Sequence, residues 1–225
     1  MNDEETLDTP EPLRAIYEAL GRDDASEMTH RPAFTGDVYQ LDDSLVCLVQ
    51  HPCAMRRGTD LVEKVLACRV SDGRASMPSD WGSGSFKKSF LPELVGGEHR
   101  SVNFPELEVV PREILTPGRR VAVMSQLGVN ILVQRWIYHN SRVAVRTITI
   151  NQQVAPVFEE ADLTMECVDD LVDGGWAADT AYSQVNTWFR NEGGALQAQL
   201  HDSQARSGVR RQMRSMVKQA LEDKD

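Results

Sequence analysis

Short runs of alternating or continuous apolar residues mark the first half of the chain and predict β-strands. Val38 and Tyr39 open one run, Asp42-Asp43 interrupts it, and Leu45 to Gln50 forms a second. Both faces of the second run are apolar, which is typical of a strand that is covered on both sides. Residues 61–70 are also apolar, with a spacing that fits either a helix or a strand.

Helical spacing of three to four residues appears in three stretches. The first is residues 10–21, which begin with two prolines and end at a glycine. The second is Ser125 to Asn140, which starts with a capping serine. The third is residues 177–221, in which Gly193-Gly194 interrupts the pattern. The middle stretch is the clearest, because its apolar residues form one stripe: Val129, Leu132, Val133, Trp136 and Ile137.

Two further segments have the composition of non-helical structure. Arg142 to Ile150 (RVAVRTITI) alternates and is rich in β-branched residues, which predicts a strand. Residues 86–117 contain four prolines, so we expect irregular structure there with short strands such as Leu107 to Val110.

These elements predict an α+β chain in three parts. Residues 1–30 form an acidic N-terminal helix or tail, residues 31–165 a β-rich domain with one embedded helix, and residues 166–225 a helical C-terminal arm. A chain of 225 residues is long enough to bury a core without disulfide bonds.

Charge narrows the choice of partners. The formal net charge is −10, which argues against a protein that coats nucleic acid non-specifically. The acid is concentrated at the N-terminus, where residues 1–31 hold nine acidic residues and three arginines. An anionic partner must therefore be met by a local cationic patch, with the acidic N-terminus left out or folded onto the basic C-terminal arm.

Motifs and segments that the sequence lacks indicate the cellular compartment and the cofactors that we expect. An acidic N-terminus and the absence of long apolar runs predict a cytoplasmic protein that contacts no membrane. The four cysteines are then expected to be free, buried thiols. We expect no cofactor, because the sequence has none of the common nucleotide-binding or hydrolase motifs. We also expect no metal, because Cys47, His51, Cys53 and Cys68 are poorly spaced for zinc.

The first candidate site is the turn that follows the Leu45–Gln50 run, which carries His51, Cys53, Arg56 and Arg57. Nearby cationic groups lower the pKa of a thiol and favour a thiolate nucleophile. The arginines alternatively hold a phosphate or carboxylate. In the structural alternative, Cys53 is a small buried apolar residue and the arginines are solvated.

The second candidate is a cationic face on the predicted helix at Ser125–Asn140. Arg135, His139 and Arg142 are separated by four and three residues and so share one side of a helix. Such a face suits a phosphate backbone or an acidic protein, and the alternative is an ordinary solvated surface.

The C-terminal arm offers a third candidate. Arg206, Arg210 and Arg214 lie four residues apart along one stripe. This stripe suits nucleic acid or an acidic protein surface, whereas the apolar residues of 195–221 suit helix association into a homo-oligomer.

Parts of the sequence resemble known small-barrel proteins. Gly36-Asp37-Val38-Tyr39, the strand after it and His51-Pro52-Cys53 resemble a group of uncharacterised bacterial and phage proteins, as does the segment from Arg120 to Arg142. The same entry strand is similar to the PemK/MazF class of toxin barrels, which cleave RNA. In that class an Arg-Pro pair follows the Gly-Asp strand, whereas here Arg31-Pro32 precedes it. The resemblance implies a small SH3-like, partly open β-barrel and a setting in mobile-element or phage-defence gene clusters.

Three functions remain open from the sequence. The leading hypothesis is an interaction protein that contacts a nucleic acid or an acidic protein through the His51–Arg57 turn and the Arg135–Arg142 face. The second is a PemK/MazF-like ribonuclease with His51 or His139 as general base. The third is an assembly protein that oligomerises through its C-terminal helices.

Overall fold

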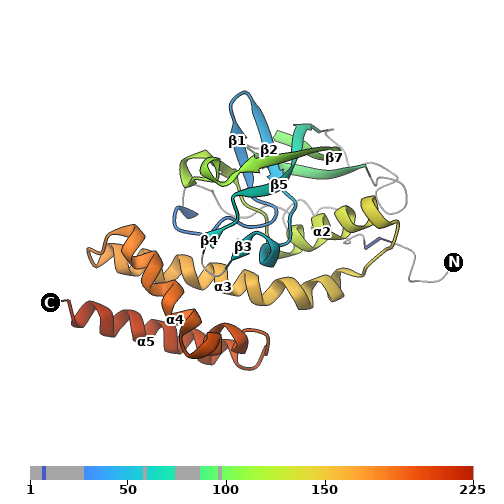
Figure 1. Ribbon diagram of the computed structural model, residues 1–225. Helices are drawn as coiled ribbons and strands as arrows, with labels where there is room; N and C mark the ends of the chain where they lie inside the picture. Colours follow the sequence, from blue (N-terminus) through green and yellow to red (C-terminus); the bar gives the residue numbers. More distant parts are fainter. Residues whose placement is uncertain (1–6, 9–27, 58–59, 74–86, 96–97, 225) are drawn as a thin grey trace. The chain divides into compact units, whose positions relative to one another are not determined.

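A computed structural model describes residues 7–8, 28–57, 60–73, 87–95 and 98–224 of the chain (Figure 1). The chain divides into two compact units. Unit 1 contains residues 33–154 together with the N-terminal segment, and unit 2 contains residues 28–32 and 155–225. No helix in the described segments is long and apolar enough to cross a bilayer. The predicted helix at 10–21 lies outside the described residues.

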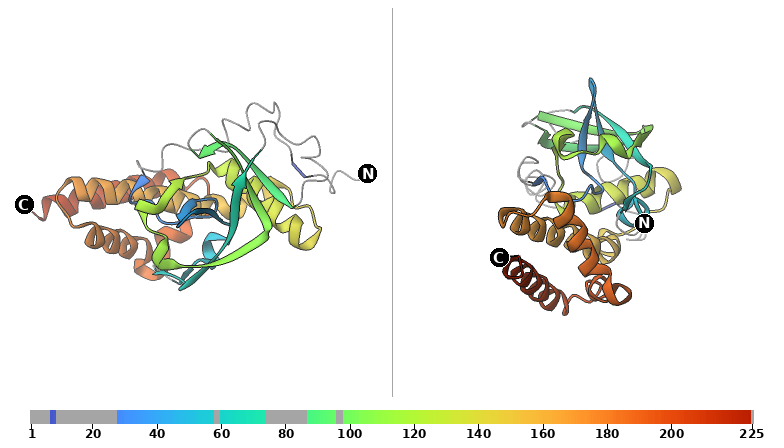
Figure 2. Two further views of the ribbon diagram at one scale, coloured as in Figure 1. Left: turned by 90° about the horizontal axis from the view of Figure 1, so that it is seen from above. Right: turned by 60° about the vertical axis from the view of Figure 1, so that its left-hand side comes forward.

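Unit 1 is built on a six-stranded antiparallel sheet in the order β6-β7-β5-β2-β1-β8. Its strands are β1 (Val38–Leu41), β2 (Ser44–Leu48), β5 (Lys64–Asp72), β6 (Lys88–Val95), β7 (Glu98–Pro111) and β8 (Arg120–Ala122). The sheet curls strongly when seen from above (Figure 2). The two edge strands β6 and β8 approach each other, but their ladders run only to β7 and β1. The α+β class is therefore confirmed, and the sheet is not a closed barrel.

The core of unit 1 follows the apolar pattern of its strands. Tyr39, Val46, Leu48, Val65 and Ala67 are fully buried in one cluster. The predicted strands at Val38-Tyr39 and Leu45–Gln50 are confirmed as β1 and β2, and the ambiguous run at 61–70 lies mainly in β5.

The expectation of irregular structure over residues 86–117 is wrong, because β6 and β7 form a long hairpin there. Of its three prolines, Pro111 ends β7, and the two in the interior of the strands occupy permissive positions. Pro92 lies in the edge strand, where the register shifts between Leu91 and Val95. Pro105 lies where β7 bulges against β5, between Asn103 and Leu107. Edge strands and bulges tolerate proline because no ladder hydrogen bond is required from it.

Helix α2 (Gln126–Ser141) confirms the clearest helical prediction. The Ser125 hydroxyl accepts a hydrogen bond from the Gly128 N–H at 3.1 Å and caps the helix as expected. The helix is buried on more than its apolar stripe, since Asn130, Gln134 and Arg135 are also buried. It contacts the sheet at β6 and, through the rings of Phe104 and Trp136, at β7.

The predicted strand at Arg142–Ile150 is wrong. Residues 142–146 have no regular structure, and helix α3 (Thr147–Asp173) begins within the alternating run. Ile150 and Val154 are both buried, and their four-residue separation is the helical period. Tertiary burial thus overrides the β propensity of the local sequence. The start of this helix is not evident from the sequence pattern.

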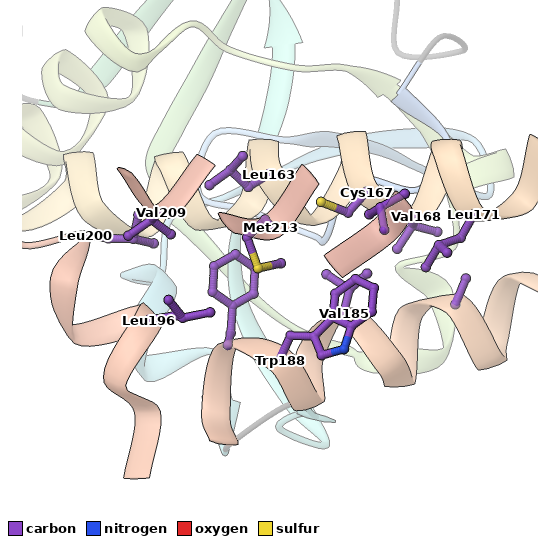
Figure 3. Close-up of a cluster of buried hydrophobic side chains, with 13 residues drawn as sticks. Leu163, Cys167, Val168, Leu171, Val185, Trp188, Leu196, Leu200, Val209 and Met213 are labelled. Atoms are coloured by element: carbon purple, nitrogen blue, oxygen red, sulfur yellow. The ribbon is translucent and has the colours of Figure 1, made fainter. Parts of the chain in front are cut away.

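Unit 2 is helical, as predicted for the C-terminal arm. It contains α4 (Ala178–Gln199), α5 (Arg206–Glu222) and the part of α3 from Ala155 onward. These helices enclose an apolar core (Figure 3), in which Leu171, Val185, Phe189 and Met213 are fully buried. The break expected near Gly193-Gly194 is placed too early, because α4 continues to Gln199 although Gly194 adopts a φ of 81°.

Candidate functional site

The turn after β2 is fixed by its own buried residues. It forms a short 3-10 helix (Pro52–Ala54) and leads into β3 (Arg56–Arg57), which pairs with β4 (Asp60–Leu61). Pro52 and Met55 are buried, and Met55 packs into the core of unit 1. The turn therefore also closes part of the apolar core.

The polar candidates of this turn differ in hydrogen bonding and in exposure. The Cys53 N–H donates to His51 Nδ1 at 3.3 Å, and partial burial lowers the pKa of His51, which favours the neutral, accepting ring. The Arg56 guanidinium donates a hydrogen bond from Nη2 to the Ala33 carbonyl at 3.0 Å. Cys53 and Arg57 are exposed. His51 and Arg56 thus have structural hydrogen bonds that the sequence did not show.

All four cysteines are free, as expected, but the expectation that all are buried is wrong for Cys53. Cys47, Cys68 and Cys167 are buried. Burial raises the pKa of each of these three thiols, to about 12 for Cys68 and Cys167. Cys53 differs because it lies on the 3-10 turn, whereas Cys47 and Cys68 lie on buried strand positions and Cys167 lies on a buried position of α3.

The Gly36-Asp37 motif belongs to the framework of unit 1. Gly36 adopts a φ of 88°, and a Cβ there would lie 3.0 Å from Met124 Sδ. The buried Asp37 carboxylate accepts from the Phe34 N–H and lies 3.4 Å from Arg120 Nε, which also donates to the Tyr39 hydroxyl. These residues start β1 and tie it to β8.

The three candidates on α2 have different environments. Arg135 is 0% exposed, so it is not part of a solvent-facing cationic surface. Its Nη2 atom lies 3.3 Å from the Asp8 carbonyl. Burial lowers the pKa of Arg135 to about 10, and the negative charge of Asp8 acts in the opposite direction. Arg135 therefore helps to hold Asp8 against α2.

His139 lies in an aromatic cluster. Its ring stacks on Trp136 at a centroid distance of 6.0 Å and lies 5.5 Å from the ring of Phe104 in β7. The cluster joins the C-terminal half of α2 to the sheet. His139 is half-buried in this packing.

Arg142 lies where α2 ends. It adopts a φ of 59°, and its N–H donates to the Tyr138 carbonyl, so it terminates the helix in the left-handed conformation. It also lines a groove of about 790 Å³ in unit 1, which we call the connection groove. The lining residues are Tyr138, Arg142, Val143, Ala144, Val145, Arg146 and Thr149.

The connection groove is held in place from both sides. The Gln134 amide donates to the Val145 carbonyl at 2.6 Å, and the Val143 N–H donates to the Ser141 hydroxyl at 3.1 Å. The Asp8 carboxylate accepts from both the N–H and the hydroxyl of Thr147 at the start of α3. Residues without regular secondary structure are thereby fixed between two helices.

The structure brings together only part of the candidate set. Arg142 lines the connection groove, whereas none of the lining residues comes from the His51–Arg57 turn. Arg146, Tyr138 and Thr149 were missed by the sequence analysis. The alternation RVAVR places Arg142 and Arg146 on one side of the predicted strand, but it does not indicate that they line a groove.

The basic stripe of α5 is paired within unit 2. Arg210 contacts Glu159 at 2.5 Å and Glu166 at 3.2 Å, and Arg214 contacts Glu166 at 2.6 Å. Arg206 donates to the Leu200 carbonyl. The acidic surface that this stripe meets is therefore that of α3.

The described residues include no group of three or more His, Cys, Asp or Glu side chains that could hold a metal ion. In comparisons with known proteins, no family model, curated protein or solved structure matches the chain.

Proposed function

We propose that this protein is a binding module that contacts an anionic partner through the connection groove. The observation that carries the proposal is the lining of the groove, which contains Arg142 and Arg146 and, among the described residues, no carboxylate. Guanidinium groups bind phosphates and carboxylates through paired N–H donors. A local site of this kind suits a chain whose net charge of −10 disfavours non-specific attraction of anions.

The proposal includes the finer fold assignment. We take the curved sheet to be a partly open, SH3-like barrel, distantly similar to the PemK/MazF class. The approach of the edge strands β6 and β8 supports this assignment, as does the role of Gly36 and Asp37 in starting β1.

The geometry favours binding over RNA cleavage. A general base must reach the proton that it removes, at a hydrogen-bonding distance or through one water. Among the described residues that line the connection groove there is no His, Cys, Asp or Glu. His139, the nearest histidine in sequence, stacks on Trp136, and His51 is not among the lining residues.

Assembly through the C-terminal helices has less support. Met213, Met216 and Val217 are the apolar residues suited to helix association. Met213 and Val217 are buried in the core of unit 2 itself, and Met216 is partly buried against that core. Arg210 and Arg214 contact α3 of the same chain.

The test is a titration with two labelled polyanions, a single-stranded RNA of about 20 nucleotides and a polyglutamate peptide, monitored by fluorescence anisotropy. We expect at least one of them to bind, with an affinity that falls as salt rises from about 50 to 200 mM. Arg142→Gln and Arg146→Gln should each weaken this binding about tenfold.

The matched control is Arg119→Gln, which removes one exposed positive charge from unit 1 outside the connection groove. It should leave the affinity within about twofold of the parent protein. The proposal is overturned if neither polyanion binds, or if Arg119→Gln weakens binding as much as the two groove variants do.

A further inference from the structure

The connection groove combines positive charge with exposed apolar side chains. Val143 lines it and is 57% exposed. Ile148, the second residue of α3, does not line the groove but precedes the lining residue Thr149 and is 65% exposed. Exposed apolar side chains grouped beside polar ones mark surfaces that bind proteins. The groove region therefore offers two kinds of contact within seven residues of sequence.

We infer that the partner is an acidic peptide segment of another protein that also carries apolar side chains. This inference rests on the proposed function and specifies the class of anion. Carboxylates of such a segment would pair with Arg142 and Arg146, and its apolar side chains would cover Val143 and Ile148. The charge of the groove lining is complementary to this partner and not to a basic one.

A peptide explains features that a nucleic acid leaves unexplained. Surfaces that bind nucleic acid are polar and strongly positive, and phosphate contacts supply most of the affinity. Exposed valine and isoleucine side chains add nothing to phosphate binding. Protein interfaces instead have an apolar centre with a charged rim, and arginine is enriched in them.

The fixed backbone of the groove favours the recognition of a segment that orders on binding. Residues 142–146 are held by Gln134 and Ser141, and Thr147 is held by Asp8. A preformed surface does not add its own ordering cost to that of the peptide.

The test compares three labelled probes of similar negative charge. The first is a peptide of about 16 residues with glutamate on one helical face and leucine on the other. The second is the same peptide with serine in place of leucine, and the third is a single-stranded RNA. We expect the leucine peptide to bind at least tenfold more tightly than the serine peptide.

Variants separate the apolar contribution from the charge. Ile148→Ser and Val143→Ser should each weaken binding of the leucine peptide about three- to tenfold and leave binding of the serine peptide unchanged. Val109→Ser is the matched control, because Val109 has the same exposure, 57%, on β7 and does not line the groove. Ile148, Val143 and Val109 are all exposed, so these substitutions should not unfold the protein.

The possible results distinguish the two proposals. This inference is overturned if the two peptides bind equally, if Ile148→Ser has no effect, or if RNA binds most tightly. The proposed anion-binding function still holds in these cases if Arg142→Gln weakens binding. If Arg142→Gln and Arg146→Gln change no affinity, the proposed function fails, and this inference fails with it.

Discussion

The carboxylate of Asp8 accepts hydrogen bonds from the N–H and the hydroxyl of Thr147, at 2.6 and 2.5 Å, across 139 residues of sequence. It thereby caps the N-terminus of α3, which has no acidic residue of its own in its first turn. A negative charge at this end of a helix is stabilised by the helix dipole and by the unpaired N–H groups.

Removal of this cap should destabilise unit 1. We expect Asp8→Ala to lower the free energy of unfolding by about 1–2 kcal/mol, the range for loss of an N-cap. Asp8→Asn should cost less, because an amide oxygen still accepts a hydrogen bond. Urea denaturation followed by circular dichroism measures both, with Asp43→Ala on the exposed β1–β2 turn as the control. Equal stability of Asp8→Ala and the parent protein would show that the cap contributes nothing.

The buried ion pair between Arg120 and Asp37 gives a second prediction. The two side chains are 2% and 1% exposed, so Arg120→Leu leaves a carboxylate buried beside an apolar group. We expect a loss of about 3–5 kcal/mol, the usual cost of breaking a buried pair. Arg119→Leu removes an exposed arginine one position earlier and should change stability by less than about 0.5 kcal/mol. The addition of Asp37→Asn to Arg120→Leu should recover part of the loss, since it removes the buried charge.

Two glycines of unit 2 should respond in opposite directions to alanine. A Cβ at Gly174 would lie 2.2 Å from Leu221 Cδ2, so Gly174→Ala forces the end of this partly buried side chain out of its rotamer and should cost about 0.5–1.5 kcal/mol. At Gly208 in α5 a Cβ meets no atom within 4 Å, and Gly208→Ala should add about 0.5–1 kcal/mol through helix propensity. Thermal denaturation of the two variants measures the difference. The same sign for both would contradict the packing argument.

Thiol chemistry should distinguish one cysteine from the other three. Cys53 is exposed, whereas burial holds the pKa values of Cys47, Cys68 and Cys167 above their usual range. A disulfide reagent added to the native protein should titrate one thiol rapidly and all four after denaturation. Cys53→Ser should abolish the rapid phase. A rapid phase that persists in this variant would mean that a buried cysteine becomes accessible.

His51 should contribute to acid sensitivity. Burial lowers its pKa from 6.5, so as pH falls through this value the unfolded chain takes up the proton more readily than the folded one. Stability is then fully present at neutral pH and lost toward acid, where the ring can no longer accept from Cys53. His51→Asn should lose less stability between pH 7 and pH 5 than the parent protein, and the exposed His201→Asn should behave like the parent.

Strands β1 and β2 and helix α2 were predictable from the chain because local pattern and final environment agree. Leu45 to Gln50 is apolar on both sides, and Ser125 precedes an apolar stripe with helical spacing. The long β6–β7 hairpin was not predictable, because its prolines are tolerated only through a sheet edge and a bulge that the fold itself creates. The start of α3 was not predictable for a related reason. Its β-branched residues are helical because Ile150 and Val154 are buried and because the Asp8 carboxylate caps the helix at Thr147.

The candidate site was predictable only in part. The sequence predicts that Arg135 and Arg142 share one helix face, but Arg142 terminates α2 in the left-handed conformation and Arg135 is buried beside Asp8. A spacing of seven residues places two side chains on one side of a helix without showing which neighbours cover that side. Arg146 entered the site because the chain leaves α2 at Arg142 and re-enters a helix at Thr147.

The sequence by itself determined the α+β class, the helical C-terminus and the free thiols. These properties depend on composition and on periodicity within one segment, which are local quantities. The tertiary structure alone decided which arginines are buried, which pair with α3 and which line the connection groove. These outcomes depend on contacts between residues far apart in the chain, such as Asp8 with Thr147, and no local pattern encodes them.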